Sequence, residues 1–177
     1  MNDRATALIV ALPEAATHVG AVRAAHDPSA AQGVPPHVTL LYPFRPLASV
    51  GRAACARIAA LAARSVPFDV RFARLGRFEG TLYLAPEPAA PFAALVQALT
   101  AEFPEHPPYG GRHADLVPHL TVAQGDAHDI DAAAAALART LPRGGFAARA
   151  RAVQMLAKEH GRWRRVHAWT LGTGAAE

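Results

Sequence analysis

One pattern of elements occurs twice in this chain and constrains its fold more than any other feature. PPHVTLLYPF at residues 35–44 and LVPHLTVAQ at 116–124 both carry Pro-His-aliphatic-Thr-aliphatic in an apolar, strand-like run. Before each motif the sequence predicts a strand closed by Pro-Glu and then a helix; after each motif it predicts a helix and a strand. This repeated order indicates a duplication.

The two copies, about residues 1–79 and 80–177, predict a single domain. The first copy comprises a predicted strand at 6–12, a helix to about 26, the motif strand at 37–41, a helix at about 48–64 and a strand at 67–75. The second comprises a strand at 81–88, a helix at 90–102, the motif strand at 119–122, a helix at about 127–141, a strand at 146–156 and a last strand at 162–171. We expect an α+β fold of two pseudo-symmetric lobes of mostly antiparallel sheet, with outer helices and a central cleft.

The histidine and threonine of each motif point to the same side of their strand, because side chains two residues apart share a face. His37 and Thr39 form one polar pair, and His119 and Thr121 form the other. A two-fold relation between the copies would bring both pairs into one cleft. The same alternation places Tyr42 on the helix-facing side, in the core.

Two imidazoles and two hydroxyls in one cleft suit phosphoryl chemistry without a metal. An ordinary histidine pKa of about 6.5 allows one neutral and one protonated ring near neutral pH, so the rings can act as general base and general acid. The hydroxyls can donate to the non-bridging oxygens. His37 and His119 are therefore predicted to be catalytic and Thr39 and Thr121 to bind phosphate. Which histidine is the base stays open.

The two motifs, together with the helix and the loop DPSAAQGVPP before the first, resemble the two-histidine phosphoesterase superfamily. The resemblance is to its 2′-5′ RNA ligase-like proteins. It implies the 2′-5′ RNA ligase-like fold and the same roles for the four motif residues. It also implies metal-independent action, without a cofactor, on 2′,3′-cyclic or 2′,5′-linked phosphodiesters of nucleotides or RNA ends.

Contacts to the rest of the substrate are predicted from strand residues near the cleft. Tyr83 and Trp169 could stack on a base, although strand aromatics often belong to the core. His167 faces either the cleft or the core. Arginines that could attract phosphate, or else lie on solvated strand faces, are Arg71, Arg74, Arg149, Arg151 and Arg165. Of these, Arg74 and Arg151 are our candidates for substrate contacts.

The loop before the second motif leaves two alternatives open. His113, Asp115 and His119 form H-x-D-x3-H, a set that can bind zinc, but it lies in a Gly- and Pro-rich loop, and we predict no metal site. The segment Tyr109-Gly-Gly-Arg112 is either a mobile lid or an ordinary connection.

Composition sets the remaining limits. No apolar run reaches the roughly 18–20 residues that span a bilayer, and ALIVAL after Asp3 is too short for a signal peptide, so we expect a cytoplasmic protein without membrane association. The single cysteine, Cys55, excludes an intrachain disulfide. A net charge of +4 permits an anionic ligand, and no obligate protein partner is evident.

The function predicted is thus a metal-independent phosphodiesterase. The alternatives are 2′-5′ RNA ligase activity, binding of RNA or a nucleotide without turnover, and a metallohydrolase. Binding alone would show a steep salt dependence and no product, whereas a metallohydrolase would lose activity in EDTA.

Overall fold

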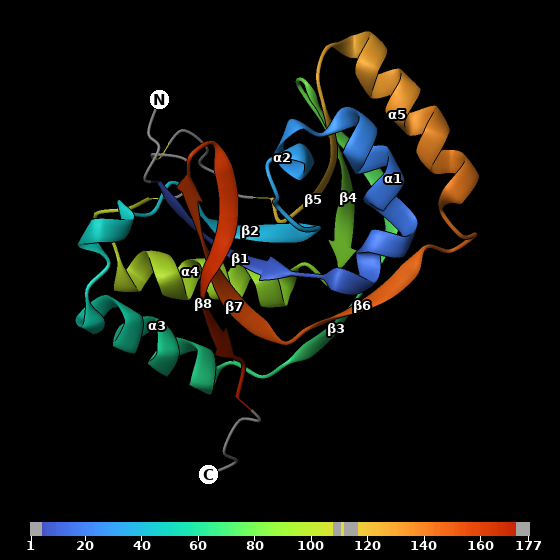
Figure 1. Cartoon of the computed structure of the whole chain (residues 1–177). Helices are drawn as coiled ribbons and strands as arrows, with labels where there is room; N and C mark the ends of the chain where they lie inside the picture. The colour runs from blue at the N-terminus through green and yellow to red at the C-terminus, as the bar shows by residue number, and fades with distance from the viewer. Residues whose placement is uncertain (1–4, 108–110, 112–116, 173–177) are drawn as a thin grey trace.

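The computed structural model describes residues 5–107, 111 and 117–172. Its centre is one strongly curled, antiparallel sheet of eight strands, in the order β6-β3-β4-β5-β2-β1-β7-β8 (Figure 1). The strands are β1 (Thr6–Ala11), β2 (His37–Leu41), β3 (Phe68–Phe78), β4 (Thr81–Glu87), β5 (Leu120–Gln124), β6 (Phe146–Ala150), β7 (Ala152–Glu159) and β8 (Arg162–Thr170).

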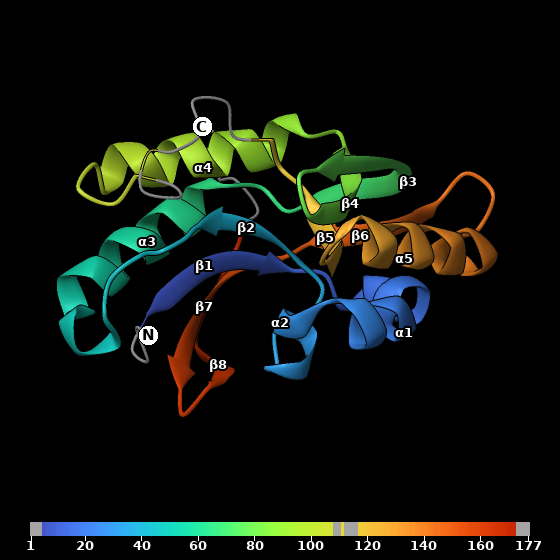
Figure 2. The same cartoon turned by 90° about the horizontal axis from the view of Figure 1, so that it is seen from above.

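The helices form two groups, one over each part of the sheet (Figure 2). They are α1 (Ala16–His26), α2 (Pro28–Ala31), α3 (Arg52–Arg64), α4 (Ala90–Glu102) and α5 (Ala127–Thr140), with short 3-10 turns at Pro13–Ala15 and Leu47–Ser49. Helices α3 and α4 pack on β8 and β2, and α1 and α5 pack on β5 and β4. No helix within the described ranges is long and apolar enough to cross a membrane.

The sheet order reads symmetrically outward from the junction of β5 and β2. On one side lie β4, β3 and β6, and on the other β1, β7 and β8. The predicted α+β fold of two pseudo-symmetric lobes with outer helices is therefore confirmed. The lobes do not coincide with the sequence copies, since β3 of the first copy pairs with β4 of the second. Likewise β7 of the second copy pairs with β1 of the first.

The core lies between the sheet and the helices and follows the strand alternation. Leu8 and Val10 of β1 are fully buried against it, as are Val38 of β2 and Val19 of α1. Burying a side chain of this size stabilises the fold by roughly 1.5–3 kcal/mol. The opposite face of the same strands is left to line a cleft.

Residues 146–156, predicted as one strand, form two. Phe146 and Ala148 of β6 are buried, whereas the first half of β7 buries Val153 and Met155, so the alternation changes phase near Arg151. β6 pairs with β3, and β7 pairs with β1 and β8. The change of phase was visible in the sequence, because a continuous strand would have turned half of these side chains to solvent.

The β7–β8 hairpin is held against the loop that leads into β2. The backbone N–H of Trp163 donates to the carbonyl of Gln32 at 2.7 Å. Gly33 beside it has φ +93°, and a Cβ there would lie 2.8 Å from the carbonyl oxygen of Trp163. This close approach requires glycine.

Replacing Gly33 by alanine should lower the free energy of unfolding by about 1–2 kcal/mol, because the side chain is strained at positive φ and meets the hairpin. Urea denaturation measures the change. Gly20→Ala is the control: Gly20 lies inside α1, and a Cβ there would have no neighbouring atom within 4 Å, so this change should raise stability by about 0.5–1 kcal/mol. Equal effects of the two substitutions would contradict the close approach.

Candidate active site

The two motif strands lie side by side at the centre of the sheet. β2 and β5 pair antiparallel at Val38 and Leu120, which are the middle residues of the two His-x-Thr motifs. Both aliphatic side chains are fully buried in the core on the helix-covered face. Their burial fixes which face of each strand carries the polar pair.

The antiparallel pairing sets each histidine against the threonine of the other motif. With Val38 opposite Leu120, His37 lies opposite Thr121, and Thr39 lies opposite His119. All four side chains line one cleft of about 740 Å³. The structure therefore brings together the four residues that the sequence singled out.

Hydrogen bonds fix both imidazole rings in the same tautomer. Nδ1 of His37 lies 2.8 Å from the carbonyl of Pro35, and Nδ1 of His119 lies 2.7 Å from the carbonyl of Val117. A carbonyl can only accept, so Nδ1 carries the hydrogen in each neutral ring and Nε2 is left as an acceptor. The Thr39 hydroxyl, 3.1 Å from Nε2 of His37, donates to it.

The proline before each histidine accounts for this orientation. Pro36 and Pro118 restrict the residue before them to extended conformations, since the proline ring crowds the preceding backbone. The carbonyl of that residue thus turns back toward the histidine two positions on. The Pro-His pair is part of the site's geometry.

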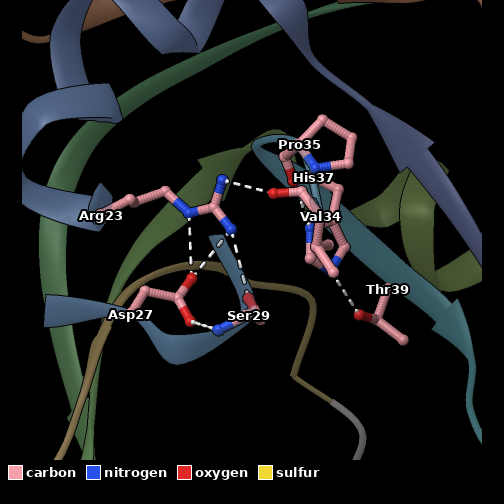
Figure 3. Close-up of polar contacts among 7 residues, drawn as sticks. All are labelled: Arg23, Asp27, Ser29, Val34, Pro35, His37 and Thr39. Carbon is pink, nitrogen blue, oxygen red and sulfur yellow. Dashed lines mark hydrogen bonds and ion pairs between the residues drawn. The ribbon is translucent and has the colours of Figure 1, made fainter. Parts of the chain in front are cut away.

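A buried ion pair stands behind His37 (Figure 3). Arg23 of α1 and Asp27 are each 2% exposed. Nη2 of Arg23 donates to Oδ2 of Asp27 at 2.8 Å, and Nη1 donates to the carbonyl of Val34 at 3.2 Å. Oδ1 of Asp27 accepts from the backbone N–H of Ser29 at 3.0 Å. The pair thus joins α1, α2 and the segment that carries the carbonyl partner of His37.

Burial lowers the pKa of both histidines. The pKa of His37 falls from 6.5 to about 4, chiefly because the ring is removed from water, and the nearby charges of Arg23 and His119 lower it further. Burial also lowers the pKa of His119 below 6.5. In each case the carbonyl that accepts from Nδ1 opposes the shift. Both rings are therefore neutral at pH 7 in the free protein.

The cleft extends from the motif residues in two directions. Toward β1, β7 and β8 its lining residues are Ala7, Ile9, Ser29, Gln32, Val34, Tyr42, Leu156, Lys158 and Trp163; toward β3 and β4 they are Phe78, Glu79, Thr81, Val117 and Gln124. We call these two parts the arms of the cleft. The arm toward β1, β7 and β8 contains a cation, Lys158, and the arm toward β3 and β4 contains an anion, Glu79.

Tyr83 lies on the cleft face of β4, with its ring centroid 5.5 Å from that of His119. Phe78 stacks on Tyr83 at 4.3 Å and lines the cleft in its place. The sequence prediction stopped the preceding strand at residue 75, but β3 continues to Phe78 and turns into β4. Phe78 was missed for that reason.

Trp169 lies away from the cleft, which corrects our expectation. The pairing of β7 with β8 shifts by one residue between Met155 and Leu156, so the later part of β8 presents the opposite alternation. Trp169 packs on the main core, and Nε2 of His167 lies 3.9 Å from Sγ of Cys55 in α3. Trp163, before the shift, lines the cleft instead.

The predicted position of Tyr42 in the core is wrong for a similar reason. The pairing of β1 with β2 shifts by one residue, so Ile9 pairs with Thr39 but Leu8 pairs with Leu41. Leu41 therefore turns into the core, and Tyr42 turns to the cleft rather than to the helices.

None of the candidate arginines lines the cleft within the described part of the chain. Arg74 is 72% exposed beside Glu87, and Arg151 pairs with Glu14 at the break between β6 and β7. Arg149 pairs with Asp69, and Arg71 donates to the carbonyl of Gly144. Arg74 and Arg151, the arginines that we predicted to contact substrate, therefore lie outside the lining of the cleft.

The remaining candidates belong to the loop before β5. Tyr109, Arg112, His113 and Asp115 lie outside the described residues. Among the residues that are described, no group of three or more His, Cys, Asp or Glu side chains is placed to hold a metal ion.

Comparison with known proteins adds a family and a fold. The family model described as 2′-5′ RNA ligase superfamily matches residues 11–162. No curated protein sequence matches the chain. Among solved structures, TT0787 of Thermus thermophilus is 23% identical with a TM-score of 0.64, covering 97% of this chain and 100% of that one. E. coli LigT complexed with NADP+ is 20% identical with a TM-score of 0.59, covering 97% and 99%. LigT complexed with 3′-AMP is 20% identical with a TM-score of 0.59, covering 96% and 99%. These likenesses show the fold.

Acidification should weaken the fold between pH 6.5 and about 4, the ordinary and the folded pKa of His37. In that range the unfolded chain binds a proton at this ring that the folded chain excludes. The free energy of unfolding therefore falls as pH falls, by up to about 3 kcal/mol, and is unaffected by this ring above the range. Urea unfolding across the range measures the slope.

His37→Gln cannot titrate and should flatten this part of the profile. His128→Gln, at an exposed position on α5, is the matched control and should leave it unchanged. The same slope in wild type and His37→Gln would show that burial of this ring does not cause the effect.

Proposed function

The chain belongs to the 2′-5′ RNA ligase superfamily, and we propose that it is a metal-independent phosphodiesterase of nucleotides or RNA ends. Its substrates are 2′,3′-cyclic or 2′,5′-linked phosphodiesters. The observation that carries this proposal is the β2–β5 pairing, which sets two histidines and two threonines of opposite motifs around one point in the cleft. LigT structures that hold NADP+ and 3′-AMP in the same fold support a nucleotide ligand.

In this mechanism the two histidines act from opposite sides of the phosphorus. One Nε2 takes a proton from water as the water oxygen attacks phosphorus. The bond from phosphorus to the departing ribose oxygen breaks, and that oxygen receives a proton from Nε2–H of the other ring. With a ribose 5′-hydroxyl in place of water and a 2′,3′-cyclic phosphate as substrate, the base takes the hydroxyl proton, the bond from phosphorus to O3′ breaks and the acid protonates O3′, so the same centre would form a 2′-5′ linkage.

The threonines bind the non-bridging oxygens. Thr39 donates to Nε2 of His37 in the free protein, and a phosphate oxygen would take over this hydroxyl when substrate binds. Thr121, opposite His37, would donate from the other strand. Two donors that are already in place stabilise the charge that develops on these oxygens.

The mechanism needs one protonated imidazole, whereas both rings are neutral in the free protein. Binding of the anionic substrate would cause one ring to take up a proton. A negative charge between the rings raises both pKa values, because it stabilises an imidazolium beside it. Burial lowers the pKa of His37 to about 4 in the free protein, and we assign this ring as the base that stays neutral. His119 takes up the proton and serves as the acid.

The test is hydrolysis of adenosine 2′,3′-cyclic monophosphate and of an oligonucleotide ending in a cyclic phosphate, in EDTA. His37→Ala and His119→Ala should each lower kcat by roughly 10²–10⁴-fold, the usual contribution of one general acid or base. His167→Ala is the matched control, since that ring lies near Cys55 of α3, and it should keep wild-type activity. Loss of activity in EDTA alone would favour a metallohydrolase.

The pH dependence checks the acid–base pair independently. We expect bell-shaped profiles, with the optimum of kcat/KM below pH 6.5 because both free-enzyme pKa values are lowered. The optimum of kcat should lie higher, since it reports the pKa values of the substrate complex. A rate that rises steadily to high pH would contradict the mechanism.

A further inference from the structure

The cleft has an aromatic wall in each of its two arms. In one arm the rings of Trp163 and Tyr42 meet edge to face with centroids 5.9 Å apart. In the other, Phe78 stacks on Tyr83 at 4.3 Å. The sheet order places these walls on opposite sides of the motif pair, since β8 lies beyond β2 and β3 lies beyond β5.

The aromatic wall formed by Trp163 and Tyr42 packs on apolar side chains. Trp163 and Tyr42 are partly buried and pack on a small cluster separate from the main core, which consists of Ala7, Ile9, Val34 and Leu156. The hydrogen bond from the backbone of Trp163 to Gln32 fixes the strand that carries the indole. A flat, largely apolar group fits such a place better than a hydrated one.

The wall at Phe78 is exposed although it is apolar. Phe78 is 40% exposed, and its ring meets that of His119 edge to face at 5.2 Å. Tyr83 supports it from beneath and lies directly over Gly76, where a Cβ would collide with the tyrosine ring. The ring is thus held rigidly at the cleft without being buried, as an aromatic surface that stacks on a ligand would be.

We propose that the substrate is a linear phosphodiester with a nucleoside on each side, one base stacking on Trp163 and the other on Phe78. This rests on the proposed function and selects, among its substrates, the 2′,5′-linked diester over the 2′,3′-cyclic phosphate. A 2′,3′-cyclic phosphate has a nucleoside on only one side of phosphorus, so its base would occupy one wall. The cleft volume of about 740 Å³ is toward the upper end of the roughly 300–1,000 Å³ typical of ligand sites.

The experiment compares three probes: adenylyl-(2′→5′)-adenosine, adenosine 2′,3′-cyclic monophosphate, and glycerol 1,2-cyclic phosphate, which has no base. Wild-type kcat/KM should be highest for the dinucleoside. Trp163→Ala and Phe78→Ala should each lower that value by roughly ten- to hundredfold, as expected for the loss of one base stack. The cyclic monophosphate should respond to one of the two changes only, and the base-free probe to neither.

Matched controls separate stacking from folding. Trp169→Ala removes the other tryptophan of β8, on the core side, and Leu75→Ala removes an apolar side chain of β3 that is 44% exposed. Neither should change the preference for the dinucleoside. Trp163→Leu keeps the wall apolar and should still lose the preference.

Two outcomes overturn the inference while the proposed function stands. One is turnover of the dinucleoside that Trp163→Ala and Phe78→Ala leave unchanged. The other is an equal loss for the cyclic monophosphate in both variants. If wild type turns over none of the probes, the proposed function fails. Binding of the dinucleoside then tests the two-walled site.

For that case the Trp169→Phe variant leaves Trp163 as the sole tryptophan of the chain. Quenching of its fluorescence by the dinucleoside, weakened by Phe78→Ala, would support the two-walled site. No quenching would refute it.

Discussion

The pairing of β2 with β5 at Val38 and Leu120 is the contact on which the site depends. It lies at the pseudo-two-fold junction of the sheet, so it joins the lobes and the two motifs at once. Because side chains alternate, burial of the two aliphatic residues turns the histidine and threonine of each strand to the cleft. A slip of one residue would exchange the two faces and bury the polar groups. The packing of Val38 and Leu120 in the core therefore also determines the positions of the polar side chains in the cleft.

The surroundings of this pair make the site responsive to an anion. Both rings donate from Nδ1 to a backbone carbonyl and present an unprotonated Nε2. The buried pair of Arg23 and Asp27 holds the loop around His37, and its two opposite charges act on that ring in opposite senses. The free site is thus neutral and preformed, and a phosphodiester would bring the charge that protonates one ring.

Much of what depends on local pattern could be predicted from the sequence. The duplicated motif predicted two lobes and the convergence of the four polar residues, and apolar periodicity predicted the helices other than α2, which lies in a segment predicted as a loop. Strand exchange between the copies could not be seen, because pairing partners are not encoded by alternation alone. The shifts in register near Leu41 and Leu156 also lay beyond it, and each reverses the face presented by the residues after it. That is why Tyr42 and Trp163 line the cleft, whereas Trp169 does not. The sequence also did not show that Arg74 and Arg151 pair with acidic side chains outside the lining of the cleft.

The most direct test of this account is a ¹H–¹⁵N NMR titration of the histidine rings with and without inorganic phosphate. The geometry predicts that His37 and His119 are both protonated at Nδ1 when neutral, with pKa values below 6.5. Added phosphate should raise both values together, since one anion would lie between the two Nε2 atoms. If phosphate moved only one ring, or if either neutral ring carried its proton on Nε2, the two motifs would not share one anion and the account would be contradicted.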